Sequence, residues 1–167
     1  MKITALFTAL AGVFSGKRRP AVDNSVVLTL DLDKYLGSWY EIARYDHFFE
    51  RGIQYAKASY TFRDDGRIGV LNTGVKNGKP KVAKGIARLT DIPALLRVSF
   101  FGPFYADYRV MLLDTGYQYA LVGSGSDKYL WILSRMPHLS EDVKRKILDE
   151  VVQRGYEPKK LIWVEQE

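Results

Sequence analysis

The feature that most constrains the fold is a series of short segments between residues 38 and 134, in which apolar and polar residues alternate. Turn residues separate these segments. The segment 55–63 shows the pattern, and Asp64-Asp65-Gly66 then supplies a tight hairpin turn. Alternation with a period of two is typical of β-strands that bury one face. The expected strands are 38–45, 55–63, 68–75, 82–89, 95–101, 108–113, 117–123 and 129–134.

Eight successive strands joined by short loops favour an antiparallel sheet in which each strand pairs with the next. An open sheet of this length would leave two exposed edges, and closure into a barrel removes them. We therefore predict an all-β protein built on an eight-stranded up-and-down antiparallel barrel.

The segment after the eighth strand has the pattern of one amphipathic helix. Ser140 is a suitable N-cap, Val143, Ile147 and Val151 fall on one face, and Gly155 ends the helix. The apolar face of this helix must be buried against the outside of the sheet.

Residues 160–164 are predicted to form a short ninth strand that buries Ile162 and Trp163. The 167 residues of the chain suffice for one well-buried domain and not for two. We assign residues 28–167 to the barrel with its helix and ninth strand, and residues 1–27 to a signal-like or flexible N-terminal arm.

The first 16 residues have the outline of a short secretory signal, with one early lysine followed by an apolar stretch and small residues. The basic run Lys17-Arg18-Arg19 lies on the wrong side of that stretch for an ordinary signal, so a flexible arm is the alternative. Leu10-Ala11-Gly12 would open a bacterial lipoprotein signal, but Val13 stands where the lipid-carrying cysteine would be. We therefore expect no lipid anchor there.

The chain has no cysteine and only two histidines, which excludes disulfides, thiolate metal sites and cysteine nucleophiles. We expect no metal site and no cofactor. The net charge is +6, and three of these charges lie in the run 17–19, so the remaining residues carry only +3. A nucleic-acid partner is therefore not expected. Abundant tyrosine and phenylalanine suit a lined cavity or a β-rich core.

Three stretches resemble the sequence signatures of the lipocalin family. Gly37-Ser38-Trp39-Tyr40-Glu41-Ile42-Ala43-Arg44 is similar to the Gly-x-Trp signature that opens the first strand. Asp114-Thr115-Gly116-Tyr117 resembles the second signature, although the aspartate here precedes the threonine, and Leu130-Trp131-Ile132-Leu133-Ser134-Arg135 resembles the third. All three occur in order within residues 30–164. The stretch Ser99-Phe100-Phe101-Gly102-Pro103-Phe104-Tyr105 resembles the bacterial outer-membrane members of the family.

The resemblance implies a barrel that binds, stores or transports a fatty acid, a lysophospholipid or a similar lipid. It places this role in the bacterial cell envelope, in the periplasm or at the outer membrane, and in membrane maintenance or stress response. It also allows a membrane surface and a second copy of the chain as partners. We expect no enzymatic activity. The alternative is an isomerase-like or haem-associated enzyme on the same scaffold, but the inner face offers it only tyrosines and Asn72.

One end of the barrel should be closed by residues of the three signatures. In an up-and-down barrel, the start of strand one, the turn after strand six and the end of strand eight all lie at the same end. An arginine over an indole face gains about 0.5–2 kcal/mol. We predict a structural role, without ligand contact, for Gly37, Trp39, Asp114, Tyr117 and Arg135.

Interior residues of a barrel alternate with exterior ones, and the charged positions set the phase. With Lys57, Arg97 and Arg109 in water, their neighbours face inward. The expected cavity lining is Ala56, Ala58, Tyr60, Val70, Asn72, Leu96, Val98, Phe100, Tyr108, Val110, Tyr129 and Trp131, and the same phase places Phe62 and Leu112 inside. Small residues at inward positions favour a void for a ligand, and the alternative is a packed core of alternating large and small residues.

The opposite end should form the mouth of the cavity. Its expected residues are Phe48, Phe49, Arg51, Phe104 and Tyr105, with Phe101, Lys76 and Lys79 beside them. Apolar residues interleaved with cations suit an acyl chain that descends into the barrel while an anionic group stays in water. We interpret His47 as a surface histidine rather than a general base. Glu41 is an inward carboxylate that needs a partner, and we leave it out of the site.

Overall fold

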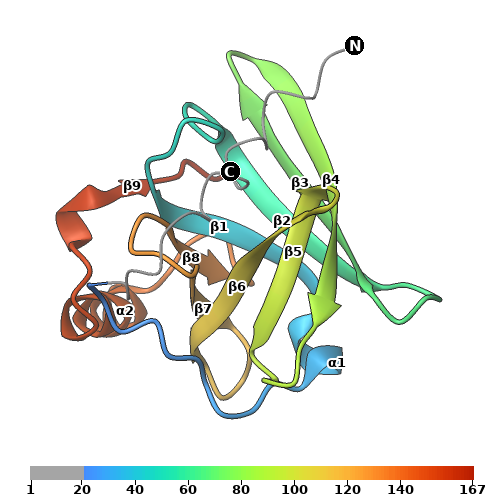
Figure 1. Cartoon of the computed structure of the whole chain (residues 1–167). Helices are drawn as coiled ribbons and strands as arrows, with labels where there is room; N and C mark the ends of the chain where they lie inside the picture. Colours follow the sequence, from blue (N-terminus) through green and yellow to red (C-terminus); the bar gives the residue numbers. More distant parts are fainter. Residues whose placement is uncertain (1–20) are drawn as a thin grey trace.

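The computed structural model describes residues 21–167 (Figure 1). The signal-like segment 1–16 and Val13 lie outside the described residues, as does the basic run 17–19. Within the described part, no helix is both long and apolar enough to cross a membrane.

The described chain forms a nine-stranded antiparallel sheet that closes on itself, which confirms the predicted barrel. Each of the first seven strands pairs with the next along the chain, and β1 also pairs with β8 and β9. The strands are β1 (Gly37–Tyr45), β2 (Gln54–Phe62), β3 (Ile68–Lys76), β4 (Lys79–Leu89), β5 (Leu95–Phe101), β6 (Phe104–Leu113), β7 (Tyr119–Gly123), β8 (Leu130–Ser134) and β9 (Leu161–Trp163).

β1 has three partners, and this arrangement decides how the barrel closes. Its first residues, Gly37 to Tyr40, pair with β2 on one edge. Further along that edge β1 leaves β2 and pairs with β9 instead. β1 and β2 therefore diverge and leave a wedge-shaped gap between them. The chain that follows β9 fills this wedge, where the Tyr55 amide donates to the Glu165 carbonyl at 2.8 Å. The Gln166 side chain also donates to carbonyls of both β1 and β2, at 2.8 and 2.9 Å.

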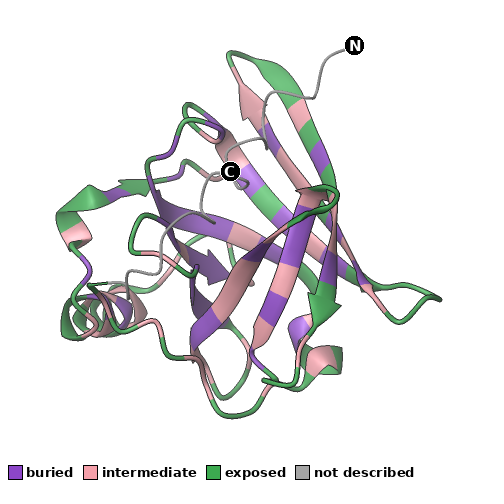
Figure 2. Ribbon diagram, viewed as in Figure 1, coloured by how far each residue is buried: buried purple, intermediate pink, exposed green. Residues whose placement is uncertain are grey.

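The buried side chains form two main clusters on opposite sides of the sheet. The inner cluster fills the barrel around Trp39, Leu96 and Val110. The outer cluster lies between the sheet and helix α2 (Glu141–Gln153), whose Ile147 and Val151 are fully buried. Figure 2 shows the corresponding alternation of buried and less buried residues along β5.

The helix agrees with the expectation from sequence. The Ser140 hydroxyl caps its first turn by accepting from the Val143 amide at 3.3 Å. Gly155 follows the helix with φ +87, a conformation that glycine adopts without strain. A four-residue helix, α1 (Leu32–Tyr35), was not predicted from sequence, and it lies at the lower end of the barrel in Figure 1.

Three expectations about burial are wrong. In β9 it is Leu161 that is buried, whereas Ile162 and Trp163 are 37% and 41% exposed. Phe62 is 53% exposed, because β2 ends there at its turn. The register of β6 shifts between Val110 and Leu112, so Leu112 packs in the outer cluster beside the helix rather than inside the barrel.

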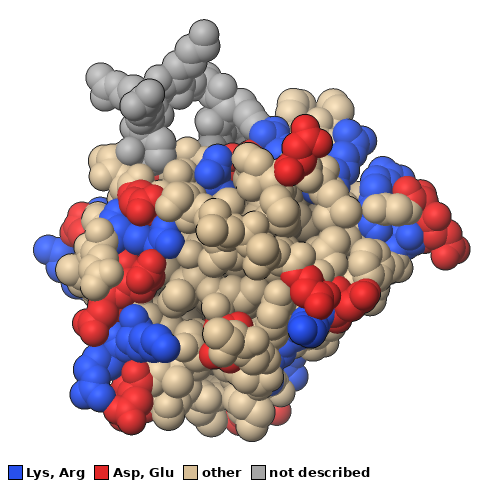
Figure 3. Space-filling view, turned by 90° about the horizontal axis from the view of Figure 1, so that it is seen from below, with Lys and Arg blue, Asp and Glu red and all other residues tan. Residues whose placement is uncertain are grey.

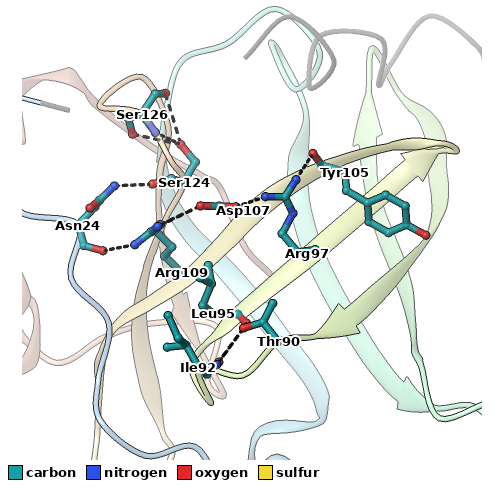
Figure 4. A network of polar contacts seen from close by, with 10 residues as sticks. All are labelled: Asn24, Thr90, Ile92, Leu95, Arg97, Tyr105, Asp107, Arg109, Ser124 and Ser126. Carbon is teal, nitrogen blue, oxygen red and sulfur yellow. Dashed lines mark hydrogen bonds and ion pairs between the residues drawn. The ribbon is translucent and has the colours of Figure 1, made fainter. Parts of the chain in front are cut away.

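Polar contacts fasten the chain that precedes α1 to the outside of the barrel (Figure 4). Asp107 bridges two guanidinium groups, accepting from Arg97 at 2.8 Å and from Arg109 at 3.0 Å. Arg109 also donates to the Asn24 carbonyl, and the Asn24 amide donates to the Ser124 carbonyl at 3.1 Å. The segment before α1 is thus held across β6 and the end of β7.

Candidate functional site

The barrel contains a cavity that is open at one end. It is mostly apolar, and its walls come from β1, β2, β3, β5, β6, β8 and the loop 46–53. The lining residues are Glu41, Phe49, Glu50, Ala58, Tyr60, Val70, Asn72, Val98, Phe100, Ala106, Asp107, Tyr108, Trp131 and Leu133.

The residues predicted to line the barrel are divided by the structure into three groups. Ala58, Tyr60, Val70, Asn72, Val98, Phe100, Tyr108 and Trp131 line the main cavity. Ala56 lines a smaller neighbouring cavity, and Leu96 lines a third, still smaller one at the closed end. Val110 is fully buried in the inner core, and Tyr129 stacks on Trp131 with ring centroids 5.9 Å apart, so neither lines these cavities.

The predicted mouth residues have different positions. Phe49 lines the cavity, and Phe48 and Phe104 are 59% and 48% exposed. Arg51 is exposed and paired with Asp46 at 3.0 Å. The ring of Tyr105 lies 4.3 Å from the guanidinium of Arg88, an exposed residue, so Tyr105 belongs to the outer surface.

The other end of the barrel is closed around Trp39, which is fully buried. The Arg135 guanidinium lies 3.8 Å above its ring, and the indole nitrogen donates to the Tyr35 carbonyl at 2.8 Å. Arg135 also donates to five carbonyl oxygens, those of Lys34, Tyr35, Leu36, Ser38 and Tyr117. Seen from this end, charged side chains of both signs surround an uncharged middle (Figure 3).

The remaining predicted closed-end residues shape the backbone there. Gly37 has φ +94, and a Cβ at this position would lie 3.4 Å from the Arg135 guanidinium. The Asp114 carboxylate accepts from the amides of Gly116 and Gln118, and Tyr117 adopts φ +57 within this turn. The Tyr117 hydroxyl accepts from the Asp31 amide at 2.9 Å, which ties the turn to α1.

Three tyrosine hydroxyls meet at the bottom of the cavity. Tyr108 contacts Tyr35 at 2.6 Å and Tyr60 at 3.0 Å, oxygen to oxygen. Burial raises the pKa of all three phenols, which therefore stay protonated. Tyr35 was missed from the sequence because α1 was missed.

The upper wall holds a buried charged cluster, of which the sequence indicated only Glu41, as an inward carboxylate that needs a partner. Arg44 is 1% exposed and donates to the Glu41 carboxylate at 2.9 Å. The same guanidinium donates to the carbonyls of Glu50 and Ile53, at 2.8 and 2.9 Å. A single side chain therefore fixes the loop 46–53 over the cavity.

A register shift in β1 explains how Arg44 reaches this position. Strict alternation from Trp39 and Glu41 would turn residue 43 inward and residue 44 outward. The pairing with β8 shifts between Glu41 and Ala43, and Ala43 packs in the outer cluster. A β-bulge of this kind re-aims the side chains that follow it, so Arg44 lies beside Glu41 on the inner side.

Burial raises the pKa values of the two carboxyls in this cluster. The pKa of Glu41 is raised chiefly by burial, against the pull of Arg44. The pKa of Glu50 is raised well above its ordinary value, by burial first and then by the charge of Glu41. The Trp131 indole nitrogen approaches the Glu50 carboxyl at 3.4 Å. With one guanidinium between two carboxyls, Glu50 holds its proton more tightly than an ordinary glutamate does.

His47 is not a surface residue, contrary to the expectation from sequence, because it is 8% exposed. Its ring lies 3.8 Å from that of Phe49, centroid to centroid, and also packs against Tyr129 and Trp131. Burial, aided by the positive charge of Arg44, lowers the pKa of His47 to about 3. The ring is therefore neutral in the folded protein at neutral pH.

This burial predicts a loss of stability in mild acid. Below pH 6.5 the unfolded chain takes up a proton at His47 that the folded protein refuses, so the free energy of unfolding should fall as pH falls from 6.5 towards 3. Each pH unit in that range should remove up to about 1.4 kcal/mol. Urea unfolding at pH 7 and pH 4.5 should show a smaller loss for His47→Gln than for the wild type. The matched control is His138→Gln, at an exposed position, which should follow the wild type.

Comparison with known proteins agrees with this geometry. A family model described as a lipocalin-like domain matches residues 30–166. The chain is 43% identical to the outer membrane lipoprotein Blc of Escherichia coli, over 98% of this chain and 95% of that protein. It is 37% identical to temperature-induced lipocalin-1 of Arabidopsis thaliana, over 81% of this chain and 79% of that one.

Solved structures show the same fold. Insecticyanin from the tobacco hornworm Manduca sexta superimposes with a TM-score of 0.71 at 20% identity, covering 90% of this chain and 87% of that one. Lobster apocrustacyanin A1 gives a TM-score of 0.66 at 19% identity, with coverages of 81% and 79%. The family match, the similarity to Blc and the barrel closed over Trp39 agree, and the chain belongs to the lipocalin-like family.

Proposed function

We propose that this protein binds and carries one lipid, such as a fatty acid or a lysophospholipid, with its acyl chain inside the barrel. The observation that supports this is the mostly apolar cavity, closed at one end by Trp39 and Arg135 and open at the other. Small-molecule sites are typically concave and mostly apolar, with a few polar groups that orient the ligand. Burial of each methylene contributes about 0.8 kcal/mol before ordering costs, so an acyl chain binds without many polar contacts.

The proposal extends to the place of action. The similar Escherichia coli and Citrobacter freundii proteins are described as outer membrane lipoproteins, and we propose that this chain works in the bacterial cell envelope. The phenylalanines at the open end, Phe48, Phe101 and Phe104, are each about half exposed. They would contact a membrane surface while a lipid enters or leaves. The proposed role is binding rather than catalysis.

The test of this function is a bulky substitution inside the cavity. Ala58 lines the cavity and is almost fully buried, so Ala58→Phe should weaken binding of a long-chain lysophospholipid at least about tenfold, the equivalent of about 1.4 kcal/mol. The readout is quenching or shift of Trp131 fluorescence on titration, since Trp131 is the tryptophan that lines the main cavity. The matched control is Lys57→Phe, at the exposed neighbouring position on β2. Unchanged affinity in Ala58→Phe, in a variant that still folds, would contradict binding inside the barrel.

A further inference from the structure

Two cavities of the barrel share one polar wall. Glu41, Glu50 and Asn72 line both the main cavity and the smaller neighbouring cavity that Ala56 lines. These three side chains come from β1, the loop 46–53 and β3, so the wall crosses the barrel interior below the mouth loop. The other polar residues of the lining already have partners, because the hydroxyls of Tyr60 and Tyr108 contact each other and Asp107 is paired with Arg97 and Arg109. This wall is therefore the place where a polar group of a ligand would be recognised.

The charges of this wall do not balance. Two carboxyl groups, Glu41 and Glu50, share one guanidinium, because Arg44 contacts Glu41 at 2.9 Å and Glu50 at 3.5 Å. His47 lies 3.4 Å from Glu50 and does not supply a second cation, since its ring is buried among aromatic side chains and neutral. A proton between the carboxyls is then needed for neutrality, because an uncompensated charge is costly inside a protein.

The wall also has hydrogen-bonding capacity that the described residues leave unused. The side-chain oxygen of Asn72 is buried and has no hydrogen-bond partner. Neither ring nitrogen of His47 is hydrogen-bonded, although His47 is 8% exposed and one nitrogen faces Glu50. A buried acceptor without a donor is unfavourable, because it has lost its hydrogen bonds to water. An incoming group that donates hydrogen bonds would therefore be stabilised here.

We propose that the wall formed by Glu41, Glu50 and Asn72 is a binding site for the ammonium group of an amine-bearing amphiphile. This inference rests on the proposed function, since it concerns the polar group of a ligand whose chain fills the same cavity. A primary ammonium carries three N–H donors, matching the two carboxyls and the Asn72 oxygen. It also carries one positive charge and takes the place of the proton that Glu50 otherwise holds.

The same chemistry ranks other headgroups below an ammonium. A hydroxyl can donate to Asn72 or to a carboxyl, but it does not balance the second negative charge. A carboxylate would add a third acidic group beside Glu41 and Glu50. Two lysines, Lys57 and Lys81, line the smaller cavity, and the Lys57 ammonium lies 4.8 Å from the Tyr40 ring. The ammonium site therefore belongs to the main-cavity side of the wall.

Three probes with the same chain test this proposal, namely decylamine, 1-decanol and decanoic acid. Calorimetric titration at pH 7 should give the amine about tenfold tighter binding than the alcohol, and the acid the weakest, because hydrogen bonds to charged groups are stronger than those between neutral groups. Amine binding should also release about one proton, measured as a dependence of the heat on the ionisation enthalpy of the buffer.

The variant that isolates the site is Glu50→Gln, which keeps the shape of the protonated acid and cannot become anionic. It should lose the preference for decylamine over 1-decanol and release no proton. Asp46→Asn is the matched control, since Asp46 is an exposed carboxylate of the same loop, and it should retain both effects. Equal binding of the three probes, or a preference for the amine that survives in Glu50→Gln, overturns the ammonium site. Absence of binding by all three overturns the lipid-binding function as well.

Discussion

Replacing Trp39 with alanine is expected to lower the free energy of unfolding by about 3–5 kcal/mol, the usual range for loss of a fully buried aromatic side chain. Trp39 is 0% exposed and packs against Tyr35 on one side and the Arg135 guanidinium on the other. Its removal leaves a void at the closed end and deprives Arg135 of its stacking partner. Chemical denaturation followed by far-ultraviolet circular dichroism measures the loss.

Trp163 provides the matched comparison. It is 41% exposed on β9, and its contact with the Lys144 ammonium lies at the surface. Trp163→Ala should therefore cost less than about 1 kcal/mol. A Trp39→Ala variant no less stable than Trp163→Ala would show that the closed end does not depend on the indole.

Replacing Arg44 with methionine should also remove about 3–5 kcal/mol at neutral pH, because breaking a buried ion pair leaves its partner charge uncompensated. Arg44→Met leaves Glu41 without its cation and the carbonyls of Glu50 and Ile53 without a donor. The loss should shrink in acid, where both carboxyls take up protons in the folded protein. Denaturation at pH 7 and pH 5 measures both effects.

Two further variants distinguish the stability contributed by the buried charged cluster from that contributed by the rest of the loop 46–53. Arg51→Met removes the exposed arginine of the same loop, whose pair with Asp46 is solvated, and should cost less than about 1 kcal/mol. Adding Glu41→Gln to Arg44→Met should restore part of the stability, since it removes the carboxylate that lost its partner. If the double variant is no more stable than Arg44→Met, the cost does not come from the unpaired charge.

The barrel was predictable because its strands alternate regularly and their turns are marked by residues such as Gly66 and Asn77. The phase taken from Lys57 and Arg97 also identified Ala58, Val70 and Val98, which line the cavity. Where alternation is broken, the prediction failed. The register shift in β1 turns Arg44 inward, and the shift in β6 turns Leu112 outward. Neither shift can be recognised from the alternation of apolar and polar residues in the sequence around it.

The position of His47 could not be obtained from its neighbours in sequence. Asp46 and Phe48 on either side are exposed, which suggests a solvated loop. Its burial depends on Tyr129 and Trp131, some 80 residues further along the chain, which form the aromatic surface against which it packs. Glu41 gave a usable signal, since an inward carboxylate in an apolar strand requires a partner. Its partner, Arg44, lies three residues further along and could be identified only once the β-bulge in β1 was known.

The wedge between β1 and β2 has a consequence for the order of folding. β1 is synthesised first, and only its residues Gly37 to Tyr40 pair with the next strand, β2. Its other hydrogen-bonding partners are β8, β9 and residues 164–166, which are more than 80 residues away. During synthesis, β2 to β7 can form successive hairpins while one side of β1 still lacks its partners. Contacts so distant in sequence slow folding and leave a strand edge open to pairing with other chains. We infer that the unpaired edge of β1 is the part of the nascent protein most in need of protection from pairing with other chains until β8 and β9 have been synthesised.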